Sequence, residues 1–194
     1  MPKIGMRHVV AAPITSEVTG QPITYGAGLI ATRAVSADIT YNRDENKHYC
    51  DDAVGESDNA ITDGTVSIAG SEFLPEARVA LFGVKKITEG DQTVYRTTAT
   101  SSPYVGLGYM TVMMYKNVYK YTAKWIHKMQ FALDSESAKT KADRIEWQNE
   151  TAKGTMMGVQ LDSSGDIAFQ DEAEFDTAEK AIAWLDKKAN IASV

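Results

Sequence analysis

The sequence predicts a β-rich fold in which two antiparallel sheets pack as a sandwich or partly open barrel, with one short helix and a C-terminal helix. Three observations support this prediction. Residues 119–131 alternate between apolar and polar side chains, residues 104–115 are apolar on both faces, and residues 176–189 carry a helical apolar stripe. The chain has 194 residues and 43% hydrophobic content, which suffices for a sizeable core. We expect one domain over residues 1–194, with an extended charged arm at about 41–59.

The first half of the chain is expected to consist mainly of strands. Residues 7–14 predict a first strand, and residues 28–41 mix β-branched and small residues without helical spacing, which predicts a long strand running into the acidic stretch. Asp63-Gly64 is typical of a turn before the alternating residues 65–68. A short helix is expected from Pro75, with Gly83 as its stop, because proline suits the first helical turn and glycine the position after the last.

The second half is expected to continue the sheets and to end in a helix. The predicted elements are a hairpin over 84–98 turning at 89–91, a central strand over 104–115, strands over 118–131, 143–148 and 153–160, and a turn at 161–167 before residues 168–175. The terminal helix is expected to be capped by Asp176, with Glu179 three residues on and two lysines at its negative end. Its apolar stripe comprises Ala178, Ala181, Ile182, Leu185 and Ala189.

The strand over 118–131 has a lysine face. Its alternation has one exception, Ile126, and predicts one buried face and one face carrying Lys120, Lys124 and Lys128. We expect these lysines to lie opposite acidic residues of an adjacent strand or of another subunit; isolated surface lysines are the alternative.

Negative charge is concentrated in the stretch YNRDENKHYCDDAVGESDN, residues 41–59. It holds six acidic and two basic side chains, a net −4 of the chain's −6. Binding a polyanion requires lysine and arginine to displace counterions, so this balance argues against a protein that grips nucleic acid. The stretch is either a chemical site or an arm that contacts another molecule.

No segment of the sequence is suited to cross a membrane or to direct export. The longest apolar run, residues 104–115, stops at 12 residues, short of the roughly 18 to 20 that a helical span requires. The N-terminal apolar run is too short for a secretory signal, and the single cysteine allows no internal disulfide, as is typical of a reducing compartment. We therefore expect a soluble protein with no membrane partner.

One glycine pattern could indicate a cofactor. The segment YGAGLIA at 25–31 matches G-x-G-x-x-A, and Asp51 or Asp52 lies about 20 residues further on, as in a dinucleotide fingerprint. The segment after Gly28 has strand character rather than helix, and no βαβ pattern surrounds it. These glycines are therefore expected to let a strand start, and no cofactor is predicted.

A metal site and a catalytic site are also considered. His48, Cys50, Asp51 and Asp52 include zinc-ligand types, but a structural site needs four firmly held ligands. A solvated acidic loop is therefore favoured, with a weak cation site formed on assembly as the alternative. His127 is expected to be a satisfied inward-facing residue rather than a general base. The carboxylate pairs at 162–166 and 171–176 fall in a turn and before a helix, and no nucleophile elbow or P-loop occurs, so we predict no metal, no catalytic residues and no enzyme.

Four segments carry a family resemblance. These are KHYCDDAVGESDN, SPYVGLGYMTV, AKTKADRIEWQNETAKGTMMG and FDTAEKAIAWLDKKA. In this order and spacing the chain resembles, from about residue 3 to residue 190, the major tail protein (tail tube protein) family of long-tailed bacteriophages that infect mainly Gram-positive bacteria. The resemblance implies two packed sheets with a flanking helix, hexameric rings stacked into a hollow tube around a tape-measure protein, and further partners at the tube ends. It implies no catalytic residues, and a location in the virion after assembly in the host cytoplasm.

The implied role gives the charged stretch a function. A tube subunit needs sheet edges that neighbours extend and a head-to-tail surface between rings. We expect the arm at 41–59 to reach a neighbouring subunit or ring, with polar contacts from Arg43, Asp44, Glu45, Lys47, His48, Asp51 and Asp52. A hexameric ring would carry six times −6, or −36, and an acidic lumen would let DNA slide through without specific binding.

Two other functions compete with this expectation. A β-sandwich binding module of a phage particle would be a monomer with a cluster of exposed aromatic side chains. A tube protein of a contractile tail or of a phage-derived injection device would share the fold and lie inside a sheath.

Overall fold

The computed structural model describes residues 2–50, 53–132 and 149–192, with side chains for all of these except 45–50 and 53–59. The strands in the described part are β1 (Lys3–Ser16), β2 (Thr24–Tyr25), β3 (Leu29–Cys50), β4 (Ala53–Phe73), β5 (Lys85–Glu89), β6 (Gln92–Arg96), β7 (Tyr104–Tyr115), β8 (Val118–Ala132), β9 (Glu150–Met157), β10 (Val159–Gln160), β11 (Ile167–Ala168) and β12 (Gln170–Phe175). The helices there are α1 (Pro75–Phe82) and α2 (Ala178–Lys188). The strand predicted at 143–148 lies outside the described residues.

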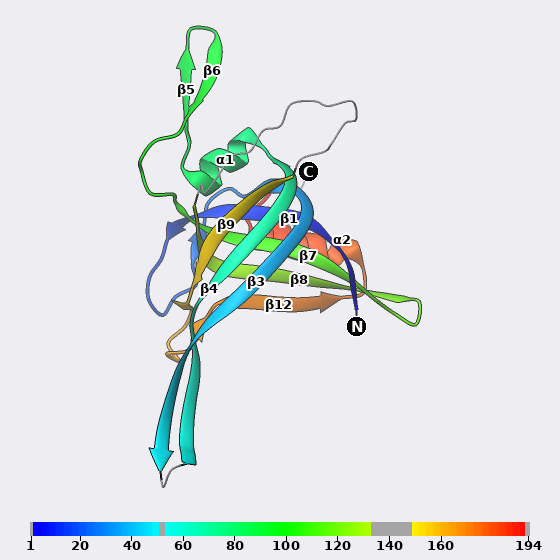
Figure 1. The fold of residues 1–194 in the computed structure, drawn as a ribbon. Coiled ribbons are helices and arrows are strands. Elements are labelled where there is room, and N and C mark those ends of the chain that lie inside the picture. Colours follow the sequence, from blue (N-terminus) through cyan, green and yellow to red (C-terminus); the bar gives the residue numbers. More distant parts are fainter. Residues whose placement is uncertain (1, 51–52, 133–148, 193–194) are drawn as a thin grey trace, which may run out of the picture.

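The main sheet closes into a barrel of six strands (Figure 1). Its strand order is β12-β8-β7-β1-β3-β4-β9, and β9 also pairs with β8, so the ring closes. One edge of β8 pairs with β7, while β12 and β9 share its other edge, β12 along residues 121–126 and β9 along 129–132. The β-rich antiparallel fold with a short helix and a C-terminal helix is confirmed.

The barrel interior is apolar, and α1 packs against it. Ala77 and Leu81 of α1 are fully buried with Val9, Ile68 and other strand residues in this inner core. Pro75 occupies the first turn of the helix, and Gly83 ends it with a φ of 69°. Both helix signals in the sequence are therefore confirmed. The predicted hairpin at 84–98 is also present, as β5 and β6 turning at Gly90.

The apolar face of β8 changes sides half-way along the strand. Trp125 lies in a second core outside the barrel, whereas Ile126, Met129 and Phe131 lie in the inner core. The cause is a register shift opposite β7, where Val105 pairs with Met129. The expectation of one continuous buried face was therefore wrong, because a bulge inserts a residue and reverses the alternation. Ile126, the exception in the sequence pattern, marks this change.

Helix α2 covers the outer face of the barrel with the stripe that the sequence predicts. Ala181, Leu185 and Ala189 are fully buried, and Ala178 and Ile182 pack at the edge of this outer core. The N-cap is Thr177 rather than the expected Asp176, because the Thr177 hydroxyl accepts the Lys180 amide. Asp176 instead pairs with Lys120 of β8. Asp176 and Thr177 are both residue types that cap helices. Because Asp176 forms the ion pair with Lys120, Thr177 caps the helix.

The turn expected at Asp63-Gly64 is absent from the described residues there. Strand β4 runs through both positions, with Asp63 opposite Asn42 and Gly64 opposite Tyr41. A Cβ on Gly64 would come within 2.6 Å of the Met156 Cε atom of β9. The glycine therefore allows a close approach between strands, and pairing on both sides of β4 overrides the local turn preference.

Candidate functional site

The long hairpin of β3 and β4 projects from the barrel (Figure 1). Strand β9 accompanies β4 only from Asp63 to Gly70. Beyond that point the ladder continues from Arg43 opposite Ile61 to Cys50 opposite Ala53, with no third strand in the described part of the chain. We call residues 43–50 and 53–61 the ribbon. At about 3.3 Å per residue it extends about 25 Å.

A bulge at the base sets the direction of the ribbon. The register shifts between Asn42 and Arg43, leaving Thr62 as the extra residue. The Asn42 side-chain amide donates to Asp63 Oδ1 at 2.5 Å, and the Thr62 hydroxyl donates to the Asn42 carbonyl at 3.3 Å. Bulges bend a strand pair and increase its twist, so this one turns the ribbon away from the barrel wall.

The structure places most of the predicted arm residues on this ribbon. Arg43 and Asp44 are exposed on β3. Glu45, Lys47 and His48 lie further along β3, opposite Asn59, Ser57 and Glu56. Asp51 and Asp52 lie outside the described residues. The sequence predicted an extended charged arm at about 41–59, and in the structure the paired strands β3 and β4 form its described part.

The three lysines of β8 have acidic partners. Lys124 Nζ lies 2.7 Å from Glu172 Oε2 of β12, and Lys128 Nζ lies 2.6 Å from Glu17 Oε2. The third, Lys120, pairs with Asp176. The expected acidic partner on an adjacent strand is found for Lys124, whose partner Glu172 lies on β12. Glu17 follows β1 and Asp176 follows β12, so the other two lysines pair with residues outside the strands.

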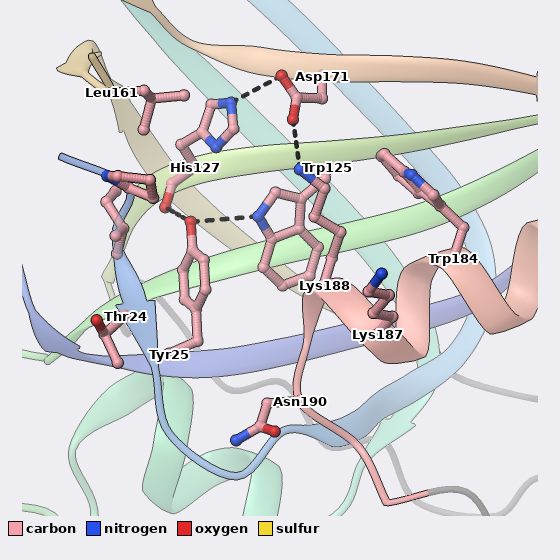
Figure 2. Close-up of a pocket in the computed structure, with 12 residues that line it drawn as sticks. Thr24, Tyr25, Trp125, His127, Leu161, Asp171, Trp184, Lys187, Lys188 and Asn190 are labelled. Carbon is pink, nitrogen blue, oxygen red and sulfur yellow. Dashed lines mark hydrogen bonds and ion pairs between the residues drawn. The ribbon is translucent and has the colours of Figure 1, made fainter. Parts of the chain in front are cut away.

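A second candidate site is a cavity of about 730 Å³ between α2, the β2 segment, β8 and β12 (Figure 2). Its aromatic wall consists of Tyr25, Trp125 and Trp184, and the Trp125 Nε1 group donates to the Tyr25 hydroxyl at 3.2 Å. The Tyr25 hydroxyl in turn donates to the His127 carbonyl at 2.9 Å. Burial raises the pKa of Tyr25 to about 12, so the phenol stays protonated and keeps this donor role.

Three hydrogen-bonded polar side chains line this cavity and are called the triad below. His127 Nε2 lies 3.1 Å from Asp171 Oδ1, and Lys188 Nζ lies 2.6 Å from Asp171 Oδ2 (Figure 2). Burial acts to raise the pKa of Asp171, but hydrogen bonds from Lys188 and His127 outweigh it, so the pKa lies below its usual range. The carboxylate is therefore ionised and can only accept, which assigns the proton to His127 Nε2. The triad ties α2 to β8 and β12.

The hydrogen bonds of the triad hold α2 against β8 and β12. Burial lowers the pKa of His127 below 6.5, although Asp171 opposes the shift. Among the described residues that line the cavity, none is a serine or a cysteine. His127 is buried and hydrogen-bonded, as the sequence predicted. The residues of this cavity come from four separate segments, so they form no continuous sequence motif. The only signal in the sequence was an isolated histidine on an apolar strand.

The glycine pattern at 25–31 has a packing role. Strand β3 begins at Leu29, directly after Gly28, as expected. A Cβ on Gly28 would overlap the carbonyl group of Ala189, just past the end of α2. Gly28 therefore permits the close approach of β3 and the helix end.

Within residues 2–50, 53–132 and 149–192, histidine, cysteine, aspartate and glutamate side chains form no group of three or more suited to a metal ion. The side chains of His48 and Cys50 lie outside that description, so the predicted absence of a metal there stays a prediction. Neither helix in the same residues is long and apolar enough to span a bilayer.

No family model matches the chain, and no curated protein matches it.

Proposed function

We propose that this chain is the structural subunit of a bacteriophage tail tube, which self-assembles into stacked hexameric rings. The observation that carries the proposal is the ribbon, an acidic two-stranded extension that leaves the barrel without a third strand in the described residues. An isolated two-stranded ribbon is marginal in water, so a ladder of this length favours a partner that covers it. The family resemblance of the sequence supplies the kind of partner, a second copy of the chain.

Strand β12 supports assembly around a ring. It pairs with β8 along one edge, and no strand of the described residues pairs with its other edge. Unpaired N–H and C=O groups on such an edge are a template for another strand. A neighbouring subunit could continue the sheet there, while the ribbon makes a contact between rings.

The proposed role is non-catalytic and needs no cofactor. Its partners are further copies of the chain, a tape-measure protein inside the tube and proteins at the tube ends. DNA passes through the lumen without specific binding, in keeping with the net charge of −6. The proposed location is the virion, with assembly in the host cytoplasm.

A ribbon-shortened variant tests the proposal. Replacing residues 44–60 by Asn-Gly joins Arg43 to Ile61, which are already paired, through a two-residue hairpin turn. The barrel should fold as before, with the same melting temperature within a few degrees, but should no longer sediment as rings or tubes at concentrations where the wild-type chain does. Unchanged tube formation by the shortened chain would contradict the proposal. The control replaces Lys116-Asn117, the two-residue turn between β7 and β8, by Asn-Gly, which keeps the strand register, and this variant should assemble as the wild type does.

A ligand-binding module is the second candidate, and the cavity in Figure 2 is the observation that favours it. Its volume of about 730 Å³ lies within the roughly 300–1,000 Å³ of small-molecule sites. Against it, the polar groups of His127, Asp171 and Lys188 already satisfy one another. This candidate predicts a monomer at every concentration.

A further inference from the structure

Two charged hairpins project from opposite ends of the barrel. The ribbon leaves one end, and the β5–β6 hairpin leaves the other, beside α1 (Figure 1). The ribbon of one subunit can therefore contact the β5–β6 hairpin of the next subunit, although it cannot reach the β5–β6 hairpin of its own chain. Such a head-to-tail contact does not close, and its repetition produces a filament.

The β5–β6 hairpin has little support from the rest of the molecule. It forms a separate two-stranded sheet, and only Ile87 and Val94, which face each other, are half-buried. The remaining side chains of β5 and β6 are exposed. A two-stranded hairpin exposed on both faces is marginally stable alone, which favours a surface that is covered on assembly.

The base of this hairpin concentrates positive charge. Lys85 lies directly opposite Arg96, and Lys86 is the next residue. Like charges opposite one another across a ladder are destabilising. Arg96 Nη2 is partly neutralised by Glu89 Oε1 at 2.7 Å, whereas Lys85 and Lys86 are exposed and have no ion pair among the described residues. An anionic partner would relieve this repulsion.

The ribbon has the opposite charge. Its residues 43–50 and 53–61 carry four acidic and two basic side chains, a net −2, whereas residues 85–96 carry three basic and two acidic side chains, a net +1. Asp44, the first acidic residue of the ribbon, is exposed. Complementary charges of this kind orient an encounter and fix its register.

We propose that the base of the β5–β6 hairpin, formed by Lys85, Lys86 and Arg96, is the docking surface for the acidic ribbon of a second copy of the chain. The inference rests on the proposed tube function and specifies which surface of the next ring receives the ribbon. The contact is a pairing of exposed charges, so it weakens as salt rises.

A charge-exchange experiment tests the docking surface. Lys85→Glu with Lys86→Glu should raise the concentration at which tubes form at least about tenfold, and adding Asp44→Lys with Glu45→Lys should restore assembly by returning opposite charges to the two surfaces. The control, Lys3→Glu with Lys153→Glu, makes the same change of charge at two exposed lysines elsewhere and should assemble as the wild type does. Circular dichroism and melting temperature verify that each variant folds.

Carbodiimide cross-linking gives a readout that does not depend on variants. In wild-type tubes, mass spectrometry should find Lys85 or Lys86 joined to a carboxylate of residues 44–58, and the opposite placement of the two hairpins makes that link intermolecular.

The possible results distinguish a failure of the docking surface from a failure of the proposed tube function. Normal assembly of the lysine variant, failure of the charge exchange to restore assembly, or absence of the cross-link would overturn the docking surface and leave the tube in place. The surface would also be overturned if the lysine variant assembled normally but lost binding to duplex DNA, since Lys85 and Lys86 would then be a phosphate site. If the wild-type chain formed no assembly, the proposed function itself would fail.

Discussion

Leu185→Ala should measure how firmly α2 is packed on the barrel. Leu185 is fully buried in the outer core, with Trp125 and Met110, which are also fully buried. Removing three carbons at about 0.8 kcal/mol each gives about 2.4 kcal/mol, before any cavity is counted. The cavity adds to this because the neighbours sit on paired strands that cannot collapse into it. We expect a total loss of about 3–4 kcal/mol in the free energy of unfolding.

Urea unfolding of the monomer, followed by circular dichroism below the assembly concentration, measures this loss. For a domain of this size it corresponds to a fall of roughly 6–16 °C in melting temperature. Leu74→Ala is the matched control, because Leu74 precedes α1 and is 43% exposed, and it should lose less than about 1 kcal/mol. A loss at Leu185 no larger than that at Leu74 would refute the packing of α2 described here.

Three further predictions concern the ties between α2 and the barrel. Because the pKa of His127 is lowered in the fold, the unfolded chain binds the proton first as pH falls. The free energy of unfolding should therefore decrease from about pH 6.5 down to the folded pKa. His127→Gln should make this decrease smaller in urea titrations at a series of pH values. An NMR titration midpoint for His127 above 6.5 would contradict it. Gly28→Ala should displace the chain after α2, because the new methyl group overlaps the Ala189 carbonyl, and should be seen as faster hydrogen exchange there; unchanged exchange would refute the contact. Thr177→Ala should cost about 1 kcal/mol in urea unfolding as the lost N-cap, whereas Thr177→Asn keeps a capping side chain and should lose less; equal losses from the two variants would contradict the assignment of the cap.

The fold was predictable where the local signal and the tertiary requirement agree. Three predicted features occur where the sequence placed them. They are the apolar stripe of α2, the proline and glycine that bound α1, and the apolar run that forms β7. The turn predicted at Asp63-Gly64 does not form because β4 pairs with a strand on each side at that point. A local sequence pattern does not show which distant strands pair with it. Closure of the barrel through β8 and β9 is likewise a pairing between distant segments.

The two candidate sites differ in the same way. The ribbon is one continuous stretch whose charge is visible in the sequence, so its residues were predicted, although its form as a ladder was not. The cavity gathers Tyr25, Trp125, Asp171 and Lys188 from four elements, and each residue alone suits an ordinary strand or helix. Only the crossing of α2 over β8 and β12 brings them together.

The most direct test of the central claim is electron microscopy of the purified wild-type chain across a concentration series, with light scattering on the same samples. The proposed tube subunit predicts rings at low concentration and hollow cylinders of uniform width at high concentration. A monomer at every concentration would contradict the tube and favour the ligand-binding module.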